Sequence, residues 1–505
     1  MASTATRIIK NTGFLYARMG ITMFISLYTT RLILNSLGAS DFGIFNLVGG
    51  AIAMLGFLNA CMAGATQRFM SYSEGEGDKE KQKRIFNISL ILHLGISFVV
   101  GIALSISGLF FFQGILNIPD SRIFAAQIVY ASLIISTMFT VMTVPYDAVM
   151  NAHENMKYYA LVGILESILK LAVAFACVYT VSDKLIVYGV LMAFIPFITL
   201  SIMRVYCHRN YEECVIAPRK YWNFNLMKDM TSYAGWSFLD ASSGMVSQYG
   251  LGLVLNHFFG TVLNAAQGIA NQVSGQLMAF SRNMLKAVNP VIMKSEGAGN
   301  RDSMLKYSIL GCKYSYLMVS FFAVPFILET PYLLNLWLKN PPEWSILFCQ
   351  LQLVRCLIEQ LTINLWASIG ATGEIKDFYK HKSLLNILPI LLTIVLFSFD
   401  FPPYWLYITW IFSWGVLTGL LILYYSHKIC GLNYSIFYLR VLFPCALNSF
   451  ISVMLGLIVI YALSSSIYRL GLTVLVCSIG FFLSYYISLP REEKSVILSL
   501  IRKRR

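Results

Sequence analysis

Long apolar stretches, joined by short polar connections, run through the whole sequence. A helix that crosses a bilayer needs about 20 mostly apolar residues, and about fourteen segments meet this requirement. Only 12% of the residues are charged, whereas soluble domains carry about 25%. A soluble core could not hide this much apolar surface, so a bilayer must solvate much of the chain. We therefore predict an all-α polytopic membrane protein with about fourteen transmembrane helices.

The basic residues follow the order of the predicted spans. If the N-terminus lies in the cytoplasm, every predicted inner segment carries at least one Lys or Arg. The predicted outer loops hold only Arg122, Lys184, Lys339 and Arg469. This alternation obeys the positive-inside rule and places both termini in the cytoplasm. The net charge of +14 is thus scattered among loops, and no nucleic-acid partner is expected.

A short polar loop occurs twice in the sequence. SEGEGD at 73–78 returns as SEGAGN at 295–300, 222 positions later. At the same offset Gly38 meets Gly260, and the motif at 154–159 resembles 374–379 at an offset of 220. Each match falls at the same station of the predicted topology, so a six-helix unit recurs. Because six is even, both copies enter the membrane in the same direction, as in parallel-repeat transporters.

The repeat divides the chain into four predicted parts. Residues 1–206 form an N-terminal six-helix half, and a cytoplasmic linker follows at 207–225. Residues 226–430 form the second six-helix half, and 431–505 hold two extra spans and a basic tail. The predicted architecture is therefore two parallel-repeat bundles, 6+6, plus two C-terminal helices. Rigid halves of this kind can rock around a site between them.

Charged residues also fall inside the predicted spans, where each costs at least roughly 2.5–3.5 kcal/mol on insertion scales. The bases are Arg18, Arg31, Lys170, Arg282, Lys286, Lys313 and Arg355, and the acids are Glu166, Asp240 and Glu359. Because the bases outnumber the acids, we predict a wet, electropositive cavity between the halves that holds an anion. The predicted substrate-binding residues are Arg18, Arg31, Lys170, Asp240, Asn271, Arg282, Lys313 and Arg355.

Each of these residues also has a purely structural interpretation. Glu166 with Lys170, and Arg355 with Glu359, stand four apart and share a helix face, so they can form internal ion pairs. Basic side chains near helix ends can snorkel to the headgroups. The polar stripe around Asn271 can serve helix packing. These alternatives stay open at the level of sequence.

The ten cysteines form no CxxC pair, and most lie inside apolar runs. This pattern predicts buried free thiols rather than disulfides or a metal site. Neither a metal nor a cofactor is expected.

The segment NTGFLYARMGITMFISLYTTRLILNSLGASDFGIFNLVGG, at 11–50, resembles the first outer turn of polysaccharide flippases. These belong to the multidrug/oligosaccharidyl-lipid/polysaccharide (MOP) exporter superfamily, whose fold is MATE-like. Arg31, Gly38, Asp41 and Gly43 are the residues placed on the family signature R-x-L-G-x-x-x-F/Y-G; Leu37 to Gly43 match it position by position, and Arg31 stands further ahead of the turn than the signature has its Arg. About fourteen spans in 6+6+2 order match the family over the whole chain.

The resemblance implies export of a surface polysaccharide, such as the O-antigen of lipopolysaccharide. Such a flippase moves an undecaprenyl-diphosphate-linked oligosaccharide across the bacterial cytoplasmic (inner) membrane by alternating access. A polysaccharide polymerase is an expected partner. The driving ion, H+ or Na+, stays open, and Glu166, Asp240 and Glu359 are the candidate coupling acids.

Three rival functions differ in their chemistry. A multidrug exporter of the same superfamily, with a cavity for cationic drugs, should have an acidic rather than a basic interior. A membrane polymerase or ligase needs a large outer surface, but no predicted outer loop exceeds roughly fifteen residues between spans of ordinary length. No P-loop, HExxH or GxSxG motif stands in a fitting context. A scaffold for glycosyltransferases would not need intramembrane bases. A non-enzymatic flippase is therefore the predicted function.

Overall fold

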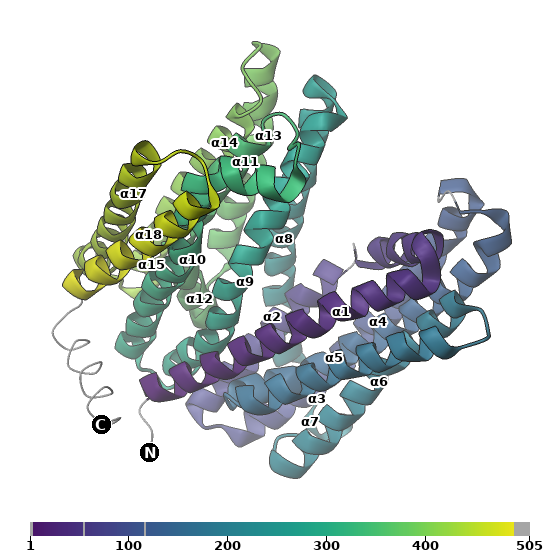
Figure 1. Ribbon diagram of the computed structural model, residues 1–505. Coiled ribbons are helices and arrows are strands. Elements are labelled where there is room, and N and C mark those ends of the chain that lie inside the picture. The colour runs from purple at the N-terminus through teal and green to yellow at the C-terminus, as the bar shows by residue number, and fades with distance from the viewer. Residues whose placement is uncertain (1–3, 54–55, 116–117, 489–505) are drawn as a thin grey trace, which may run out of the picture. The chain divides into compact units, whose positions relative to one another are not determined.

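The computed structural model describes residues 4–53, 56–115 and 118–488. Regular secondary structure in these ranges is entirely helical, which confirms the predicted all-α fold (Figure 1). The chain divides into two compact units. The first contains the described residues up to Ala241 together with Met293–Asn300, and the second contains Ser242–Ile292 and the described residues from Arg301 onward. The boundaries predicted from the repeat stay a prediction.

The helices of the first unit include one long bent helix, five others that reach 20 residues or more, and three short segments. They are α1 (Thr4–Ala53), α2 (Gly56–Glu76), α3 (Lys79–Phe110), η1 (Phe111–Ile115), η2 (Asp120–Arg122), α4 (Ile123–Ala152), α5 (Met156–Tyr179), α6 (Lys184–Asn210) and α7 (Pro218–Tyr221). Two further helices, α8 (Phe224–Phe259) and α9 (Thr261–Gly297), contribute to both units.

The second unit is built from the remaining helices. They are α10 (Arg301–Leu338), α11 (Ser345–Gln360), α12 (Ile363–Thr372), α13 (Lys376–Ser398), α14 (Trp405–Trp410), η3 (Ile411–Leu417), α15 (Thr418–Cys430), α16 (Tyr434–Phe437), η4 (Tyr438–Leu442), α17 (Phe443–Ala462) and α18 (Ile467–Ser488).

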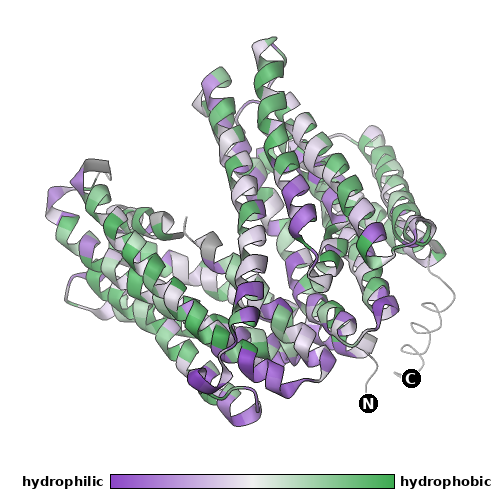
Figure 2. Ribbon diagram, turned by 180° about the vertical axis from the view of Figure 1, so that it is seen from behind, coloured by the Kyte–Doolittle hydropathy of each residue, from purple (hydrophilic) through white to green (hydrophobic). Residues whose placement is uncertain are grey.

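Many of these helices are long and apolar enough to cross a membrane. Among the described residues nine qualify, or up to eleven if two bent helix pairs each count as one span. The long helices α2, α8 and α9 fall outside this set, because polar residues interrupt their apolar stretches. Hydrophobic colouring runs along much of α3 to α6 in Figure 2. Phe98 of α3 and Phe194 and Phe197 of α6 are exposed. The protein is a multi-pass membrane protein, and the total of about fourteen spans stays a prediction.

The internal repeat is visible in the backbone. Gly38 bends α1 with φ 78°, and Gly260 separates α8 from α9 with the same φ of 78°. The loop glycines Gly77 and Gly299 have φ values of 73° and 69°. Glycine tolerates this left-handed region because it lacks a Cβ. Helices α3 and α10 then begin 222 residues apart, so the predicted six-helix repeat has matching turns at matching stations.

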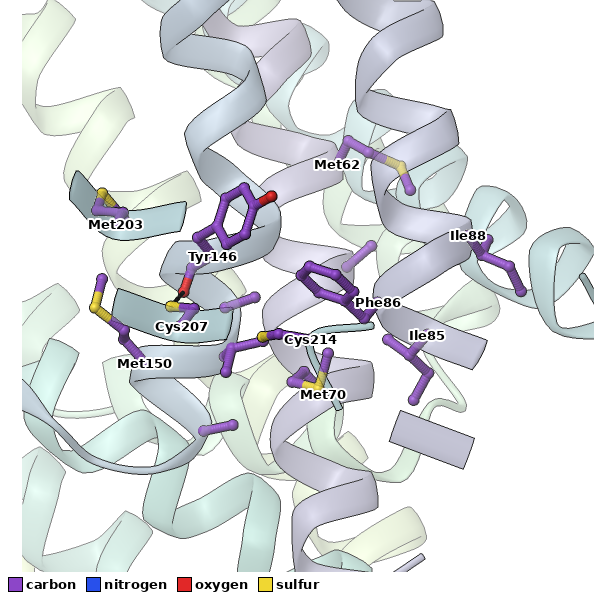
Figure 3. Close-up of a cluster of buried hydrophobic side chains, with 14 of the residues drawn as sticks. Met62, Met70, Ile85, Phe86, Ile88, Tyr146, Met150, Met203, Cys207 and Cys214 are labelled. Carbon is purple, nitrogen blue, oxygen red and sulfur yellow. Dashed lines mark hydrogen bonds between the residues drawn. The ribbon is translucent and has the colours of Figure 1, made fainter. Parts of the chain in front are cut away.

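The first unit is held together by a cluster of buried side chains from α2, α3, α4 and α6. Figure 3 shows Phe86, Tyr146, Cys207 and Cys214 close together, with Met150 at one side of the cluster. The Cys207 thiol donates to the Tyr146 carbonyl at 3.9 Å. All ten cysteines are free and buried, as the sequence predicts.

The segment predicted as a linker packs firmly on α3. The side-chain nitrogen of Asn87 donates to the Val215 backbone carbonyl at 2.7 Å. The side-chain oxygen of Asn87 accepts from the Ala217 backbone N–H at 2.9 Å. One buried amide thus satisfies two backbone groups of an otherwise irregular stretch. The chain between α6 and α7 is therefore part of the first unit.

The C-terminal pair α17 and α18 packs side by side (Figure 1) and against α10. The fully buried Glu329 carboxylate of α10 accepts from Arg469 Nε at 3.0 Å and from a terminal guanidinium nitrogen at 2.8 Å. Tyr316 of α10 also contacts Ser449 of α17 at 2.7 Å between the hydroxyl oxygens. The pair predicted as an appendage is thus fixed to the second unit.

Candidate functional site

Arg18 of α1 packs closely against the neighbouring helix α5 of the first unit. Its guanidinium carbon lies 4.6 Å from the centroid of the Tyr159 ring on α5. A Cβ placed on Gly163 would lie 2.1 Å from Arg18 Nε, far inside the 3.0 Å that real Cβ atoms respect. Gly163 therefore makes room for the guanidinium. Within the described part of the chain Arg18 forms no ion pair with a carboxylate.

One turn further along α5 stands the predicted pair of opposite charges. Lys170 Nζ donates to Glu166 Oε1 at 2.6 Å, and both side chains are about two-fifths exposed. The helical spacing predicted that these groups share a face. Glu166 lies three residues after Gly163, so Arg18 and this ion pair occupy one side of α5. The first unit therefore groups two bases with one acid.

The second unit contains a connected polar network around Arg355. Arg355 pairs with Glu359 at 2.5 Å, and its Nε donates to Gln352 Oε1 at 3.2 Å. The Gln352 amide nitrogen in turn contacts Asn271 Oδ1 at 3.3 Å and Ser274 Oγ at 3.2 Å. The predicted stripes of α9 and α11 therefore meet. Because Glu359 neutralises Arg355, this network carries little net charge.

Two tryptophans cover the Arg355 guanidinium. Its central carbon lies 4.1 Å from the centroid of Trp410 and 5.5 Å from that of Trp414. The π-helical segment η3 begins directly after Trp410 and contains Trp414. Such segments are rare and frequently occur at functional sites. Arg355 itself is 7% exposed, so the tryptophans shield it from solvent.

The remaining predicted bases lie in different surroundings. Lys313 is 2% exposed, and its Nζ lies 5.5 Å from the Tyr314 ring centroid and 5.9 Å from that of Tyr485 on α18. It therefore faces the C-terminal helices. Arg282 is exposed and donates to the Gly275 carbonyl at 2.8 Å. Arg31 is exposed on α1.

The polar stripe of α8 also points inward. Asp240 is 5% exposed and Ser247 is fully buried. Ser243, between them, accepts from the Asn386 amide of α13 at 2.9 Å. Within the second unit, this hydrogen bond therefore joins α8 to α13.

The structure thus forms one group of predicted residues in each unit. Arg18, Lys170 and Glu166 lie on α1 and α5, and Arg355, Glu359 and Asn271 lie on α9 and α11. Both i,i+4 pairs form ion pairs, which the structural interpretation also predicts. A substrate cavity and the coupling roles of Asp240, Glu166 and Glu359 stay predictions.

Sequence reasoning missed an ion cluster at the turns predicted to be outer. Arg122 binds both Asp41 and Asp183, at 2.9 Å to Asp41 Oδ1 and 2.6 Å to Asp183 Oδ2. Asp183 also caps α6 by accepting from the backbone N–H groups of Leu185 and Ile186. The hydrogen bond from Arg122 holds the pKa of Asp183 below its ordinary value. The sequence offered one indication of this cluster, because Arg122 is the single basic residue of its predicted outer loop.

Comparison with known proteins gives the fold. No protein-family model matches the sequence, and no curated protein matches it. Solved structures do match. A MATE transporter in its bent conformation has a TM-score of 0.71 at 16% identity, covering 85% of this chain and 96% of the other. An outward-facing multidrug resistance MATE transporter of the MOP superfamily has a TM-score of 0.68 at 15% identity, covering 85% of this chain and 97% of the other.

The chain has the MATE fold. A third similar structure is a MOP superfamily transporter from Pyrococcus furiosus, in which reverse polarity of the binding pocket suggests a different function. It has a TM-score of 0.68 at 16% identity, and the match covers 86% of this chain and 97% of the other. The MATE-like architecture predicted from the sequence is therefore confirmed. Because the MATE chains are almost fully covered, this protein carries additional residues beyond the shared fold.

Proposed function

We propose that the protein flips a polyprenyl-diphosphate-linked oligosaccharide across a membrane by alternating access. The MATE fold supports transport, because the similar structures named above are transporters. The main support for an anionic substrate is the environment of Arg18. Its charge is held against α5 by Gly163 and is not neutralised by a described carboxylate.

The chemistry of a diphosphate suits this arrangement. A diphosphate and its sugars cannot cross hydrocarbon unaided, because they lose their hydration. A guanidinium offers a planar set of donors that matches phosphate oxygens and forms charge-assisted hydrogen bonds. Arg18 would therefore bind the diphosphate, and Lys170 beside Glu166 would add a second, partly compensated charge. The polyprenyl chain would stay in the lipid.

The second unit would handle a different part of the substrate. Its network of Arg355, Glu359, Gln352 and Asn271 is polar but nearly neutral. Amide and carboxylate groups of this kind suit sugar hydroxyls. The division between a cationic group in one unit and a neutral polar group in the other fits a substrate with a charged head and an uncharged glycan.

The fold is compatible with more than one kind of binding pocket. The Pyrococcus furiosus transporter has a binding pocket of reverse polarity, which suggests a different function for it. A change in pocket polarity on this fold therefore has a precedent. The extra residues beyond the MATE fold also agree with the two additional helices of polysaccharide flippases that the sequence resembles.

The location and partners follow from the same proposal. We place the protein in the bacterial cytoplasmic membrane with both termini inside, because the basic residues follow the positive-inside rule. The glycan would be an O-antigen or a related surface polysaccharide, and a polymerase would act on it after flipping. H+ or Na+ would drive transport through Glu166, Asp240 or Glu359.

Deletion of the gene in its host tests the proposal. We expect the lipid-linked oligosaccharide to accumulate in the inner leaflet and surface polysaccharide to disappear. Absence of the lipid-linked precursor would instead indicate an enzyme that makes it. Unchanged polysaccharide together with increased sensitivity to cationic drugs would indicate the multidrug exporter.

Point variants extend this test to the site. Arg18→Ala and Arg355→Ala should each abolish polysaccharide output, and Arg18→Ala should leave protein levels near normal. Lys170→Ala should reduce it, because Glu166 then keeps an uncompensated charge. Normal output from all three variants would remove these residues from the substrate path.

A further inference from the structure

The repeated loops contact each other through two glycines. Within the first unit, a Cβ placed on Gly75 would lie 2.1 Å from the Lys294 carbonyl oxygen. A Cβ placed on Gly297 would lie 2.0 Å from the Tyr72 carbonyl oxygen. Real Cβ atoms essentially never come within 3.0 Å of another heavy atom. Both positions therefore require glycine in this conformation.

The two contacts are equivalent under the internal repeat. Gly75 corresponds to Gly297, and Tyr72 corresponds to Lys294, at the offset of 222 residues. Each copy of the loop thus supplies a glycine for the carbonyl of the other copy. This reciprocity explains why the small polar loop occurs twice, since a larger residue in either copy would break the contact.

A partly buried ion pair holds the same end of α9. Lys294 Nζ lies 3.2 Å from Glu154 Oε1, and Arg7 lies 3.6 Å from the same oxygen. The Glu154 side chain is only 5% exposed. Asn11 donates to the Glu154 backbone carbonyl at 3.0 Å. We call this group of residues the α9 seat. It consists of Tyr72, Gly75 and Glu154, together with the last residues of α9 and the loop that follows (Met293–Asn300).

The α9 seat also contains features that oppose its closure. Glu154 has a φ of +55°, a conformation that costs a non-glycine residue energy. Its second carboxylate oxygen is buried and accepts no hydrogen bond from the described residues. Buried polar atoms without partners are rare and costly. The seat therefore combines close packing with local strain, as a contact that forms and breaks would.

The α9 seat lies where helix α9 passes from one unit to the other. Helix α9 belongs to the second unit up to Ile292, and its last residues belong to the first unit together with the loop that follows (Met293–Asn300). We propose that the α9 seat is a releasable latch, so that the end of α9 leaves and re-enters it during each transport cycle. This inference deepens the proposed function and rests on its alternating access.

Thiol labelling tests the latch without any substrate. Ser73 is adjacent to Tyr72 and fully buried, and its hydroxyl donates to the Asp78 carbonyl. Ser73→Cys is close to isosteric and places a thiol in the seat. Labelling of residue 73 by a membrane-permeant maleimide, followed by peptide mass spectrometry, reports how often the seat opens. The native cysteines are buried. Peptide mass spectrometry also distinguishes a label on residue 73 from a label on any of them.

Glycine variants then change the seat, with matched controls in the same helices. In the Ser73→Cys protein, Gly75→Ala or Gly297→Ala should accelerate labelling at least about tenfold. Gly64→Ala in α2 and Gly275→Ala in α9 should change it less than about twofold, because no heavy atom lies within 4 Å of a Cβ there. Glu154→Gln, which keeps the side-chain volume, should also accelerate labelling in protein that elutes as a monodisperse species.

Two results would overturn the latch. Seat variants that label at the rate of the controls would show that the glycine contacts do not hold the seat closed. Complete protection of residue 73 in otherwise unmodified, folded protein would show that the seat never opens. Neither result depends on the substrate. If labelling behaves as expected but gene deletion leaves the lipid-linked precursor unchanged, the latch stands and the flippase proposal fails.

Discussion

Removing Arg469 should severely destabilise the second unit. In the structure its guanidinium makes two hydrogen bonds to the Glu329 carboxylate, at 3.0 and 2.8 Å. Glu329 is fully buried, and the Arg469 side chain is 12% exposed. In Arg469→Ala the carboxylate keeps the hydrogen bond from the Thr473 hydroxyl at 2.9 Å. A buried charge would then lack its counter-charge.

The magnitude follows from this geometry. Removing one partner of a buried ion pair typically costs about 3–5 kcal/mol, because the other charge stays desolvated. Replacing both partners with apolar residues of similar volume is often neutral or stabilising. We therefore expect Arg469→Ala to lower the free energy of unfolding by about 3–5 kcal/mol. The double variant Glu329→Leu/Arg469→Met should lose less than about 1 kcal/mol.

Denaturant unfolding of detergent-solubilised protein, followed by tryptophan fluorescence, measures these differences. Ser478→Ala on α18 is a suitable control, since its hydroxyl donates to the Val474 carbonyl of its own helix. The reasoning would be refuted if Arg469→Ala unfolded like the wild type. It would also be refuted if the double variant were as unstable as the single one.

Two further predictions concern other contacts. Gly163→Ala should displace the Arg18 guanidinium and reduce polysaccharide output at least about tenfold, whereas Gly20→Ala on α1, with open space around it, should retain output. An equal loss in both variants would contradict this. Because Arg122 lowers the pKa of Asp183, the stability from this pair is present at neutral pH. It should be lost as the pH falls below about 4, the ordinary aspartate value, through the lowered folded value. Asp183→Asn should abolish this acid-side loss of stability, and a variant that still shows the full loss would disprove the assignment.

Features that depend on spacing along the chain could be predicted from the sequence. The apolar periodicity gives the helices, and the 222-residue offset gives the repeat with its glycine turns at Gly38 and Gly260. The four-residue spacing of Glu166 and Lys170 predicts a shared face, and the two groups are 2.6 Å apart. These features follow from local helix geometry, which depends only on positions along the chain.

Features that depend on tertiary packing could not be predicted in this way. Arg18 and Gly163 are 145 positions apart, and nothing in either segment indicates that one makes room for the other. Glu329 was not among the predicted intramembrane acids, and its partner Arg469 was assigned to an outer loop. Lys313 was grouped with the cavity residues, yet it faces the ring of Tyr485 on α18. Which face of a long helix meets which neighbour is decided by packing, and a single sequence does not record it.

The most direct test of the account is transport by the purified protein. Wild type and Arg18→Ala would be reconstituted into liposomes that contain a polyprenyl-diphosphate-linked oligosaccharide in both leaflets. A membrane-impermeant glycosidase or lectin then measures how much of the inner pool becomes accessible. We predict that the wild type exposes the inner pool and that Arg18→Ala does so at least about tenfold more slowly. An inner pool that stays protected with the wild type, or equal rates for both proteins, would contradict the account.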